Sequence, residues 1–578
     1  MKKICTILFA GAACTVLPPS RATAQAPTIT RFAPGRNAMD ASASGDAELT
    51  FSQPVAGASG IRVFGNRRNG LLTGTVRGDG TTQLGFHTTQ GFGLGATVSV
   101  TVPASVHGTG AGSPAVAGTV YQFRTQAGSG LFTPDFVGSS SLPEVGTALY
   151  EPTLADLNND GLLDLLLADA QNDRVRLRLG SSASPGFFGP ATLLSTGPQP
   201  GSIAVADMNN DGQLDLLTSS NGSALRMVSV ALGDGLGGFG AAVAVPMAGT
   251  PGRVQVGDVN ADGNLDFVVP VLAPAGSAST VLAVRLGNGQ GSFTAAPDVP
   301  LDLSASSPNL HLADFNNDGQ LDCLVGSTST NLLKTYLGNG QGGFVLAGTA
   351  PIARTGPTDV ADLTGDGVLD VVMADGPGNA VRLYPGTGQG GFGAATVFAV
   401  TNPSSVMATG EPNGVGIFAT YNSTTGSGTA AWHKASYSTA FTAPRLMSNC
   451  AGTALAMGTV YGGFPLLVIV DNGLNGSSPN VKARLNQVVT ASRTSANALL
   501  LTCYPNPAHG TVQLALPTGA ARNGRVELYN GLGQRVSRQE LPTGGPTTLD
   551  ISHLPAGLYT LRATAEGLGT STQSLAIE

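Results

Sequence analysis

Residues 155–169 read ADLNNDGLLDLLLAD, and this stretch decides how the rest of the chain is interpreted. Asp156, Asp160 and Asp164 fall within nine residues, and an apolar run follows them at once. Carboxylates that lie close together repel one another, by about 1 kcal/mol per pair at 4 Å in water and several-fold more near a protein surface. The sequence therefore predicts that positive charge is held among these three side chains.

The same nonapeptide recurs four more times, at intervals of about 50 residues. Each copy runs into an apolar segment, a second strand-like segment, a glycine-rich turn and a Phe. Apolar and polar residues alternate in VRLRL (175–179), as they do in a half-buried strand. A unit of this length holds four short strands, which make one blade of a β-propeller. The copies begin at residues 156, 207, 258, 314 and 362.

Five acidic copies do not close a ring comfortably, but two worn copies follow them. The stretches that begin at Gly410 and Gly458 keep the Gly and the apolar strand but lack the acids. A Phe-led stretch at 131–138 precedes the first copy, and we expect it to complete the last blade. This pairing would remove the exposed sheet edges that invite aggregation. We therefore predict seven blades over residues 131–490.

The acidic loops have the donor pattern of a calcium site. Side-chain oxygens fall at positions 1, 3, 5 and 9, Gly stands at position 6, and position 7 offers its backbone carbonyl. Ca²⁺ takes about six to eight hard oxygens in a tolerant geometry, whereas Mg²⁺ prefers a strict octahedron and retained waters. Position 12 is never Glu, so these are not EF-hands. The alternative is a set of Asp-Gly turns closed by Asx hydrogen bonds.

We therefore expect about five Ca²⁺ ions, one for each acidic loop. The predicted ligands are Asp156, Asn158, Asp160, Leu162 and Asp164; Asp207, Asn209, Asp211, Gln213 and Asp215; Asp258, Asn260, Asp262, Asn264 and Asp266; Asp314, Asn316, Asp318, Gln320 and Asp322; and Asp362, Thr364, Asp366, Val368 and Asp370.

At these residues the chain resembles the FG-GAP (VCBS-type) repeats of integrin-α-like β-propellers, over about 360 residues. The resemblance implies that the calcium is structural, because such loops tie the strands of a blade together in that family, and that ligands bind elsewhere on the ring. The worn copies depart from the pattern, so no metal is assigned to them.

The segments on either side of the repeats also look like β-domains. Residues 27–126 contain short strand-like runs such as ATVSVTVP, with turn signals every 8 to 12 residues, and this pattern predicts a small sandwich. The segment resembles the bacterial Ig-like domains that precede propellers on secreted proteins. The predicted fold is therefore all-β: a seven-bladed propeller between two Ig-like β-sandwiches.

The C-terminal sandwich is predicted over residues 499–578. CYPNPAHGTVQLALP (503–517) and LDISHLPAGLYTLRA (549–563) alternate like strands. The segment resembles the type A sorting domain of the type IX secretion system; the alternative is one more Ig-like module. The resemblance implies a Bacteroidota-type Gram-negative cell, contact with the type IX secretion machinery, and export to the medium or the outer cell surface, where this domain is removed.

The first 24 residues read as a secretory signal peptide. Lys2 and Lys3 precede an apolar run, and Ala22-Thr23-Ala24 forms a cleavage site. A membrane anchor, the alternative, needs about 20 apolar residues. No later segment is apolar enough to span a bilayer, so no transmembrane anchor is expected after cleavage. The net charge of −7 and the lack of a basic stripe argue against nucleic acid as a partner.

Cysteine and histidine give little support to a catalytic site. Cys323, Cys450 and Cys503 are too few and too far apart for a disulfide framework or a zinc site, and we expect Cys323 to be buried. His311 either faces the channel with an acid or is packed as a structural residue. Trp432 with His433 belongs either to a glycan-stacking patch or to the core.

No catalytic or cofactor-binding residue is assigned. The G-x-G-x-x-G runs precede Phe-led strands rather than helices, which makes them hairpin turns. Two functions from different classes are compatible with the sequence. The first is a calcium-stabilised, non-enzymatic binding or adhesion scaffold for glycan or protein ligands. The second is an extracellular polysaccharide lyase or hydrolase built on a propeller.

Overall fold

The structure is a computed structural model of the 578-residue chain. The predicted signal peptide, residues 1–24, lies outside the described residues, as does Cys450. Within the described part, no helix is long and apolar enough to cross a membrane. The residues that the structure describes are 25–68, 70–110, 113–126, 136–143, 149–181, 188–220, 222, 225–272, 280–301, 309–327, 331–352, 356–411, 414–423, 426–435, 440–448, 454–460, 464–471, 480–486, 502–504, 508, 510–515, 524–530, 535–541, 547–555, 557–565 and 569–577.

The chain divides into two compact units, Met1–Val488 and Val489–Glu578. The first unit begins with a β-sandwich. One of its sheets has the order β1-β2-β6-β5, a second has the order β4-β7-β9, and β3 pairs with β8. The two sheets enclose a core in which Leu49, Val63, Val98 and Tyr121 are buried. A sandwich was expected in this region, and its assignment as Ig-like stays a prediction. The elements are β1 (Ile29–Ala33), β2 (Ala47–Phe51), β3 (Val55–Ala56), η1 (Ala58–Gly60), β4 (Arg62–Gly65), β5 (Gly74–Arg77), β6 (Gln83–Thr88), β7 (Thr97–Val102), β8 (His107–Gly108) and β9 (Thr119–Arg124).

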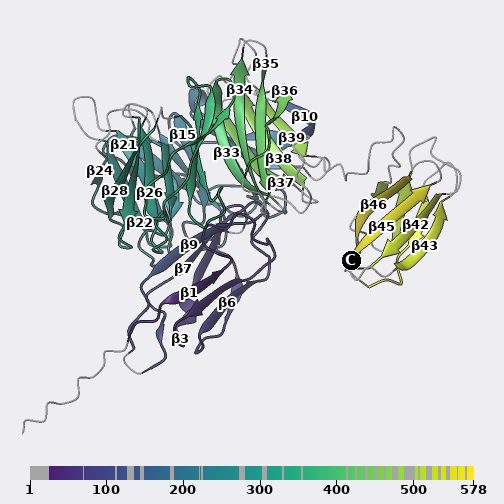
Figure 1. The fold of residues 1–578 in the computed structure, drawn as a ribbon, viewed down its shortest axis with the longest axis horizontal. Coiled ribbons are helices and arrows are strands. Elements are labelled where there is room, and N and C mark those ends of the chain that lie inside the picture. Colours follow the sequence, from purple (N-terminus) through teal and green to yellow (C-terminus); the bar gives the residue numbers. More distant parts are fainter. Residues whose placement is uncertain are drawn as a thin grey trace, which may run out of the picture. The chain divides into compact units, whose positions relative to one another are not determined.

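The rest of the first unit consists of antiparallel sheets, of which the described residues form seven (Figure 1). Sheet 1 holds β11 (Leu149–Ala155), β12 (Asp164–Asp169), β13 (Arg174–Gly180) and β14 (Phe188–Leu194), with η2 (Ala170–Asn172) between β12 and β13. Sheet 2 holds β15 (Pro200–Ala206), β16 (Asp215–Ser220), β17 (Met227–Ala231) and β18 (Val243–Pro246). Sheet 3 holds β19 (Thr250–Pro251), β20 (Gln255–Gly257), β21 (Asp266–Leu272), β22 (Val281–Gly287), β23 (Phe293–Ala295) and β24 (Val299–Pro300).

The remaining sheets follow the same plan, with each strand beside the next in the chain, except that β10 from before the repeats forms the last strand of sheet 7. Sheet 4 holds β25 (Asn309–Ala313), β26 (Asp322–Ser327), β27 (Leu332–Gly338) and β28 (Phe344–Pro351). Sheet 5 holds β29 (Thr358–Ala361), β30 (Asp370–Asp375), β31 (Ala380–Tyr384) and β32 (Thr396–Ala399). Sheet 6 holds β33 (Pro403–Glu411), β34 (Gly414–Ser423), β35 (Gly426–Ala435) and β36 (Arg445–Ser448). Sheet 7 holds β37 (Ala454–Val460), β38 (Phe464–Asp471), β39 (Asn480–Asn486) and β10 (Phe136–Pro143).

Backbone contacts close these sheets into a circuit. The inner strands touch in the order β11, β15, β20, β25, β29, β33, β37 and back to β11. Strand β10, which precedes the first repeat, pairs with β39, so that Phe136 lies opposite Asn486. This confirms the expectation that the segment before the repeats completes the last sheet. The strand begins at Phe136, and residues 131–135 lie outside the described part.

The core lies between neighbouring sheets. Leu166 of sheet 1 belongs to the same buried cluster as Leu216 of sheet 2, and Leu466 of sheet 7 to the same cluster as Leu165 of sheet 1. Each fully buried side chain of this kind stabilises the fold by roughly 1.5–3 kcal/mol. Because the last sheet packs against the first, side chains close the ring as the backbone pairing does.

Sheets 6 and 7 differ from the others in the connection between their first two strands. Glu411 pairs with Gly414, and Val460 pairs with Phe464, so each pair of strands is joined by a short hairpin. The sequence located both strands, but it indicated only that the acids had been lost. The structure shows that the loop itself is shorter, which leaves no room for a nonapeptide at these places.

Two side chains settle alternatives that the sequence left open. Trp432 is 2 % exposed, and its ring centroid lies 5.6 Å from that of Phe398. The glycan-stacking alternative is therefore wrong for Trp432, which is a core residue; the side chain of His433 lies outside the described part. Cys323 is free and buried, which confirms its expected role as a small apolar residue.

The second unit has two sheets, ordered β40-β41-β44 and β43-β42-β45-β46 (Figure 1). Val512, Val526, Leu561 and Leu575 are buried in its core. This arrangement agrees with the strand-like alternation of the C-terminal sequence. The strands are β40 (Thr502–Tyr504), β41 (Thr511–Ala515), β42 (Gly524–Tyr529), β43 (Arg535–Leu541), β44 (Thr547–Asp550), β45 (Gly557–Ala565) and β46 (Gly569–Ile577).

We predict that Gly287→Ala destabilises the ring. A Cβ atom at this position would lie 2.1 Å from the carbonyl oxygen of Leu265, so the backbone of sheet 3 would have to move. Overpacking of this kind costs about 1–3 kcal/mol in the free energy of unfolding, which urea denaturation measures. Gly240→Ala is the control, because its Cβ would meet its nearest neighbour at 3.6 Å. Equal stabilities of the two variants would contradict the prediction.

Candidate metal loops and central cavity

Five acidic loops each join the inner strand of sheets 1 to 5 to the strand that follows it, β20 to β21 in sheet 3. The carboxylate at position 1 closes each loop. In the first loop, Asp156 accepts hydrogen bonds from the N–H groups of Asp160 (3.1 Å) and Gly161 (2.9 Å). Gly161 has φ 85°, a conformation that glycine adopts without strain, so the expected sharp turn at position 6 is confirmed. The residues that close the other loops in the same way are Asp207, Asp258, Asp314 and Asp362.

Positions 3 and 5 bond to each other in the first four loops. Nδ2 of Asn158 donates to Oδ2 of Asp160 at 2.9 Å, and Oδ1 of Asp160 accepts from the N–H of Leu162 at 2.8 Å. In the fifth loop Thr364 stands at position 3, and its buried Oγ1 has no hydrogen-bond partner. The equivalent pairs are Asn209 with Asp211, Asn260 with Asp262, and Asn316 with Asp318.

The carboxylate at position 9 connects the loop to the third strand of its sheet. Asp266 is completely buried; its Oδ2 accepts from the N–H of Val259 (2.9 Å) and its Oδ1 from the N–H of Gly287 (2.7 Å). Both oxygens thus bind backbone N–H groups, one in the loop and one at the end of β22. The equivalent residues are Asp164, Asp215, Asp322 and Asp370, which bond to the N–H groups of Gly180 and Gly338 at the ends of β13 and β27 and of Gly233 and Gly386 just after β17 and β31.

Burial of these carboxyl groups raises their pKa values. The pKa of Asp266 rises to about 8, mainly because of burial and then because of the charge of Asp258. Burial likewise raises the pKa of Asp164, Asp215 and Asp322 to about 7. The ionised loops therefore hold negative charge that the surrounding protein does not fully balance.

The donor set of each loop suits a hard cation in kind, since every predicted ligand offers oxygen. The unpartnered hydroxyl of Thr364 and the raised pKa values agree with such a site. In the described residues, however, no group of three or more His, Cys, Asp or Glu side chains has an arrangement that could hold a metal ion. The loops are closed by their own hydrogen bonds, as the Asx-turn alternative predicts, so calcium stays a prediction. A bound ion would supply positive charge among the carboxylates.

Neighbouring loops are joined through positions that the sequence analysis did not single out. Nδ2 of Asn159 at position 4 donates to Oε1 of Gln213 at position 7 of the next loop (2.6 Å). Nδ2 of Asn210 donates in the same way to Oδ1 of Asn264 (2.9 Å). The sequence signal for these links was the pair of consecutive Asn residues in three of the five copies. Position 7 was predicted to act through its carbonyl, and this stays a prediction. The side chains of Gln213 and Asn264 at this position link the first three loops.

The N-terminal sandwich contacts all five loops. Two of its guanidinium groups lie beside position-1 carboxylates. They supply part of the positive charge that the sequence led us to expect among the loop carboxylates. Gly70 allows one of these approaches, because a Cβ there would lie 2.1 Å from Cβ of Asp207. The contacts are Arg68 Nε to Asp156 Oδ2 (3.4 Å), Leu71 N–H to Asp207 Oδ2 (2.9 Å), Thr101 Oγ1 to Asp258 Oδ2 (2.8 Å), Arg36 Nη1 to Asp314 Oδ2 (3.1 Å) and Asn37 Nδ2 to the carbonyl of Gly367 (3.2 Å).

Two further arginines of the sandwich reach the inner strands. Arg67 donates to the carbonyl oxygens of Leu154 in β11 and Met457 in β37. Burial, and then the nearby charge of Arg124, lowers the pKa of Arg67 to about 10. Arg124 donates to the carbonyl oxygen of Val360 in β29 at 3.0 Å. Sequence reasoning missed these residues, although the Arg doublet in GNRRNG stands out in a chain with few charges.

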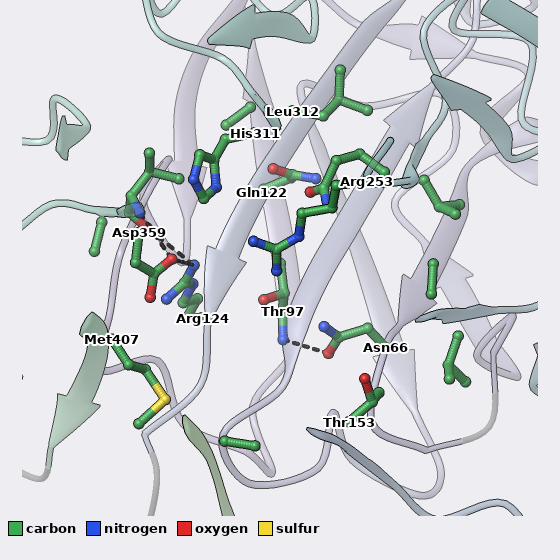
Figure 2. Close-up of a pocket in the computed structure, with 18 of the residues that line it drawn as sticks. Asn66, Thr97, Gln122, Arg124, Thr153, Arg253, His311, Leu312, Asp359 and Met407 are labelled. Carbon is green, nitrogen blue, oxygen red and sulfur yellow. Dashed lines mark hydrogen bonds and ion pairs between the residues drawn. The ribbon is translucent and has the colours of Figure 1, made fainter. Parts of the chain in front are cut away.

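A cavity of about 610 Å³ lies between the sandwich and the inner strands of all seven sheets. Figure 2 shows Arg124, Arg253 and His311 around this cavity, with Asp359 beside Arg124. Nη2 of Arg124 is 3.6 Å from Oδ1 of Asp359, and Nε of Arg253 is 3.3 Å from Oε1 of Glu151. The ring therefore encloses a polar space lined by charges of both signs.

His311 combines the two roles between which the sequence could not decide. It lines the cavity, but it is 7 % exposed and its Nε2 lies 2.8 Å from Oγ1 of Thr358. Burial, followed by the charge of Arg253, lowers its pKa to about 4. The imidazole is therefore neutral at physiological pH and is held by the next inner strand.

We predict that removal of divalent cations lowers the melting temperature. At tenfold excess over Kd, each independent calcium site would add roughly 1.4 kcal/mol to stability, so thermal melts with Ca²⁺ and with excess chelator should differ. Asp262→Asn should reduce this difference, whereas Asp40→Asn, on the exposed surface outside the loops, should not. Identical melts of the wild-type chain in the two buffers would count against calcium.

The metal-free protein should lose stability as the pH rises from about 6.5 to 8. The pKa values of Asp164, Asp215 and Asp322 near 7, and of Asp266 near 8, exceed the ordinary 3.8, so the folded chain keeps protons that the unfolded chain has released. His311 acts in the opposite direction, but only between about pH 4 and 6.5.

Urea denaturation of dialysed protein across this pH interval measures the effect. Added Ca²⁺ should flatten the dependence, because the ion favours the ionised carboxylates. A free energy of unfolding that rises with pH in the metal-free state would refute the prediction.

Comparisons with known proteins agree with the repeat pattern. An FG-GAP-like repeat family matches residues 156–218, 271–325 and 314–373, and the secretion system C-terminal sorting domain matches residues 502–578. The acidic loop at 258–266 falls outside these matches. No curated protein matches the chain.

Three solved structures illustrate the structural similarity. BBS1N in complex with ARL6DN has 12 % identity and a TM-score of 0.43, over 61 % of this chain and 97 % of that one. A fungal alcohol oxidase of the AA5 family in complex with copper has 12 % identity and a TM-score of 0.39, over 78 % and 100 %. A functionally unknown protein from Desulfotomaculum acetoxidans has 11 % identity and a TM-score of 0.38, over 52 % and 86 %.

The match over residues 502–578 identifies the second unit, and it confirms the sorting-domain prediction over the alternative of a further Ig-like module. Such a domain directs a protein to the type IX secretion machinery of Bacteroidota-type bacteria. The chain is therefore an exported, propeller-type protein that carries FG-GAP-like repeats and, over residues 502–578, a type IX sorting domain.

Proposed function

We propose that this exported protein is a non-enzymatic scaffold that binds a glycan or protein ligand outside the cell or at its surface. The observation that carries the proposal is the polar cavity enclosed by the inner strands. It is a concave space of the size that ligands occupy, about 300–1,000 Å³, in a chain addressed for export. Cleavage of the sorting domain at the surface is part of this proposal.

The state of the cavity carboxylates supports binding rather than catalysis. Oε2 of Glu151 accepts from Oγ of Ser202 at 3.0 Å, and Oδ2 of Asp359 accepts from the N–H of Ala408 at 2.9 Å. A general acid or base needs a carboxyl group that can reach the reacting atom. These two groups serve instead to join neighbouring inner strands.

The acidic loops have a structural part in this proposal. They sit between the sheets and the N-terminal sandwich, where calcium would add to the hydrogen bonds that already hold the two together. An ion at each loop would offset the repulsion between buried carboxylates. The binding surface would then be the cavity and not the loops, four of which present their position-1 carboxylate to the sandwich.

We predict that the mature protein retains polysaccharides or surface proteins without cleaving them. A glycan array and a pull-down of surface proteins would identify the ligand, and incubation with polysaccharides would test for products. New reducing or unsaturated ends, absent with heat-denatured protein, would favour the enzymatic alternative. Failure to bind any glycan or surface protein would refute the scaffold proposal.

A further inference from the structure

The cavity contains a guanidinium group with unused hydrogen-bonding capacity. The side chain of Arg253 is 40 % exposed, and its one described contact is that of Nε with Glu151 at 3.3 Å. Nε itself forms no hydrogen bond of good geometry. Its two terminal nitrogens have no acceptor among the described residues. A guanidinium has five N–H donors arranged as a fork, which suits the two oxygens of a carboxylate or sulfate.

Glu151 and Asp359, the acids of the cavity, do not accept hydrogen bonds from the terminal nitrogens of Arg253. Their oxygens already accept hydrogen bonds from backbone N–H groups. Oε2 of Glu151 also accepts from the N–H of Ile203 at 3.1 Å. Oδ1 of Asp359 accepts from the N–H of Val360 at 2.8 Å, in addition to the bond of its Oδ2 with Ala408. These hydrogen bonds hold both carboxylates against the inner strands, so neither can form a two-point ion pair with an arginine.

The charges around the cavity leave an excess of positive charge. Three arginines, Arg67, Arg124 and Arg253, line it together with the two acids Glu151 and Asp359. His311 lies close enough to both Arg124 and Arg253 for their charges to disfavour its protonation. The two guanidinium groups flank one neutral imidazole, and each lies beside one acid. With Arg67 the cavity as a whole carries one more positive than negative group, which favours an anionic ligand.

Neutral polar groups and apolar side chains line the rest of the space. Amide side chains come from Asn66, Gln122 and Asn309, and hydroxyl groups from Thr153 and Ser99. Ser99 is 8 % exposed, and its buried Oγ has no hydrogen-bond partner. A buried hydroxyl without a partner is costly, so it is available to a ligand. The amide and hydroxyl groups suit the hydroxyl groups of a sugar, and the apolar side chains suit the C–H faces of its ring.

We propose that the central cavity binds an acidic sugar, whose carboxylate or sulfate group lies between Arg253 and Arg124 while its hydroxyl groups meet the amide and hydroxyl side chains. The inference rests on the proposed binding role and names the ligand class. Arg253 is the main anchor, because its terminal nitrogens have no acceptor in the part of the chain that the structure describes. Arg124 contributes charge while it remains bonded to the inner strands.

Isothermal titration of the full chain with galacturonic acid trisaccharide tests the proposal. The methyl-esterified trisaccharide keeps the sugar but removes the charge, and it should bind about tenfold or more weakly. Arg253→Gln should weaken binding of the acidic form by a similar factor, and Arg253→Lys, which keeps the charge but not the fork, by less. Arg77→Gln, on the exposed surface of the sandwich, is the matched control and should bind normally. Thermal melts of each variant verify that it is folded.

A sulfated galactose trisaccharide and an oligoglutamate peptide identify the source of the anion. Binding of either acidic sugar that depends on Arg253 supports the proposal, and the tighter of the two identifies the acid group. Preference for the peptide, equal binding of the esterified trisaccharide, or binding that Arg253→Gln leaves unchanged would overturn it. If a glycan array also shows an Arg253-independent ligand, the scaffold function stands and only this assignment fails.

Discussion

A buried carboxylate that bonds two backbone N–H groups is the constraint on which the ring of sheets depends. In each of the first five sheets it joins the acidic loop to a Gly at or just after the end of a later strand, as Asp266 does for Val259 and Gly287. An unpaired buried charge is very unfavourable, and hydrogen bonds to backbone groups reduce that cost. The same bond requires Gly at the third strand, because a side chain there would collide with a carbonyl oxygen. One Asp therefore holds the acidic loop against the later strand of its sheet, at a position where only Gly fits.

The loops fixed in this way form a platform for the N-terminal sandwich. Position-4 and position-7 side chains connect the first three loops, and the sandwich adds hydrogen bonds or ion pairs to all five. Arg67 and Arg124 continue past the loops to the inner strands, and the space beyond them is the polar cavity. The end of the ring that carries the acidic loops is therefore covered by the sandwich. The proposed acidic ligand would bind Arg253 in the cavity inside the ring.

Local features of this structure could be predicted from the sequence, whereas contacts between distant segments could not. The repeat fixed the strands of the sheets and the turn at Gly161, because each follows from spacing and glycine content within about 50 residues. The Phe-led strand before the repeats could be assigned to the last sheet because a ring without it would leave an open edge. The pairing of Arg36 with Asp314, or of Arg68 with Asp156, has no local signal, since it depends on how the sandwich sits on the loops. The cavity arginines were missed for the same reason, and the shortened hairpins of sheets 6 and 7 were hidden by the loss of the motif.

The pairing of β10 with β39 also sets an order in which the molecule can be completed. These strands are more than 300 residues apart in sequence, and they lie side by side in sheet 7. A chain that is still being synthesised, or one cut before residue 480, has the first strand of the pair but not its partner. Closing so long a loop is entropically costly and slow compared with the formation of local hairpins. Until that late step, the unfinished molecule presents two unsatisfied strand edges, so the interval before closure is when it is most prone to associate with other chains.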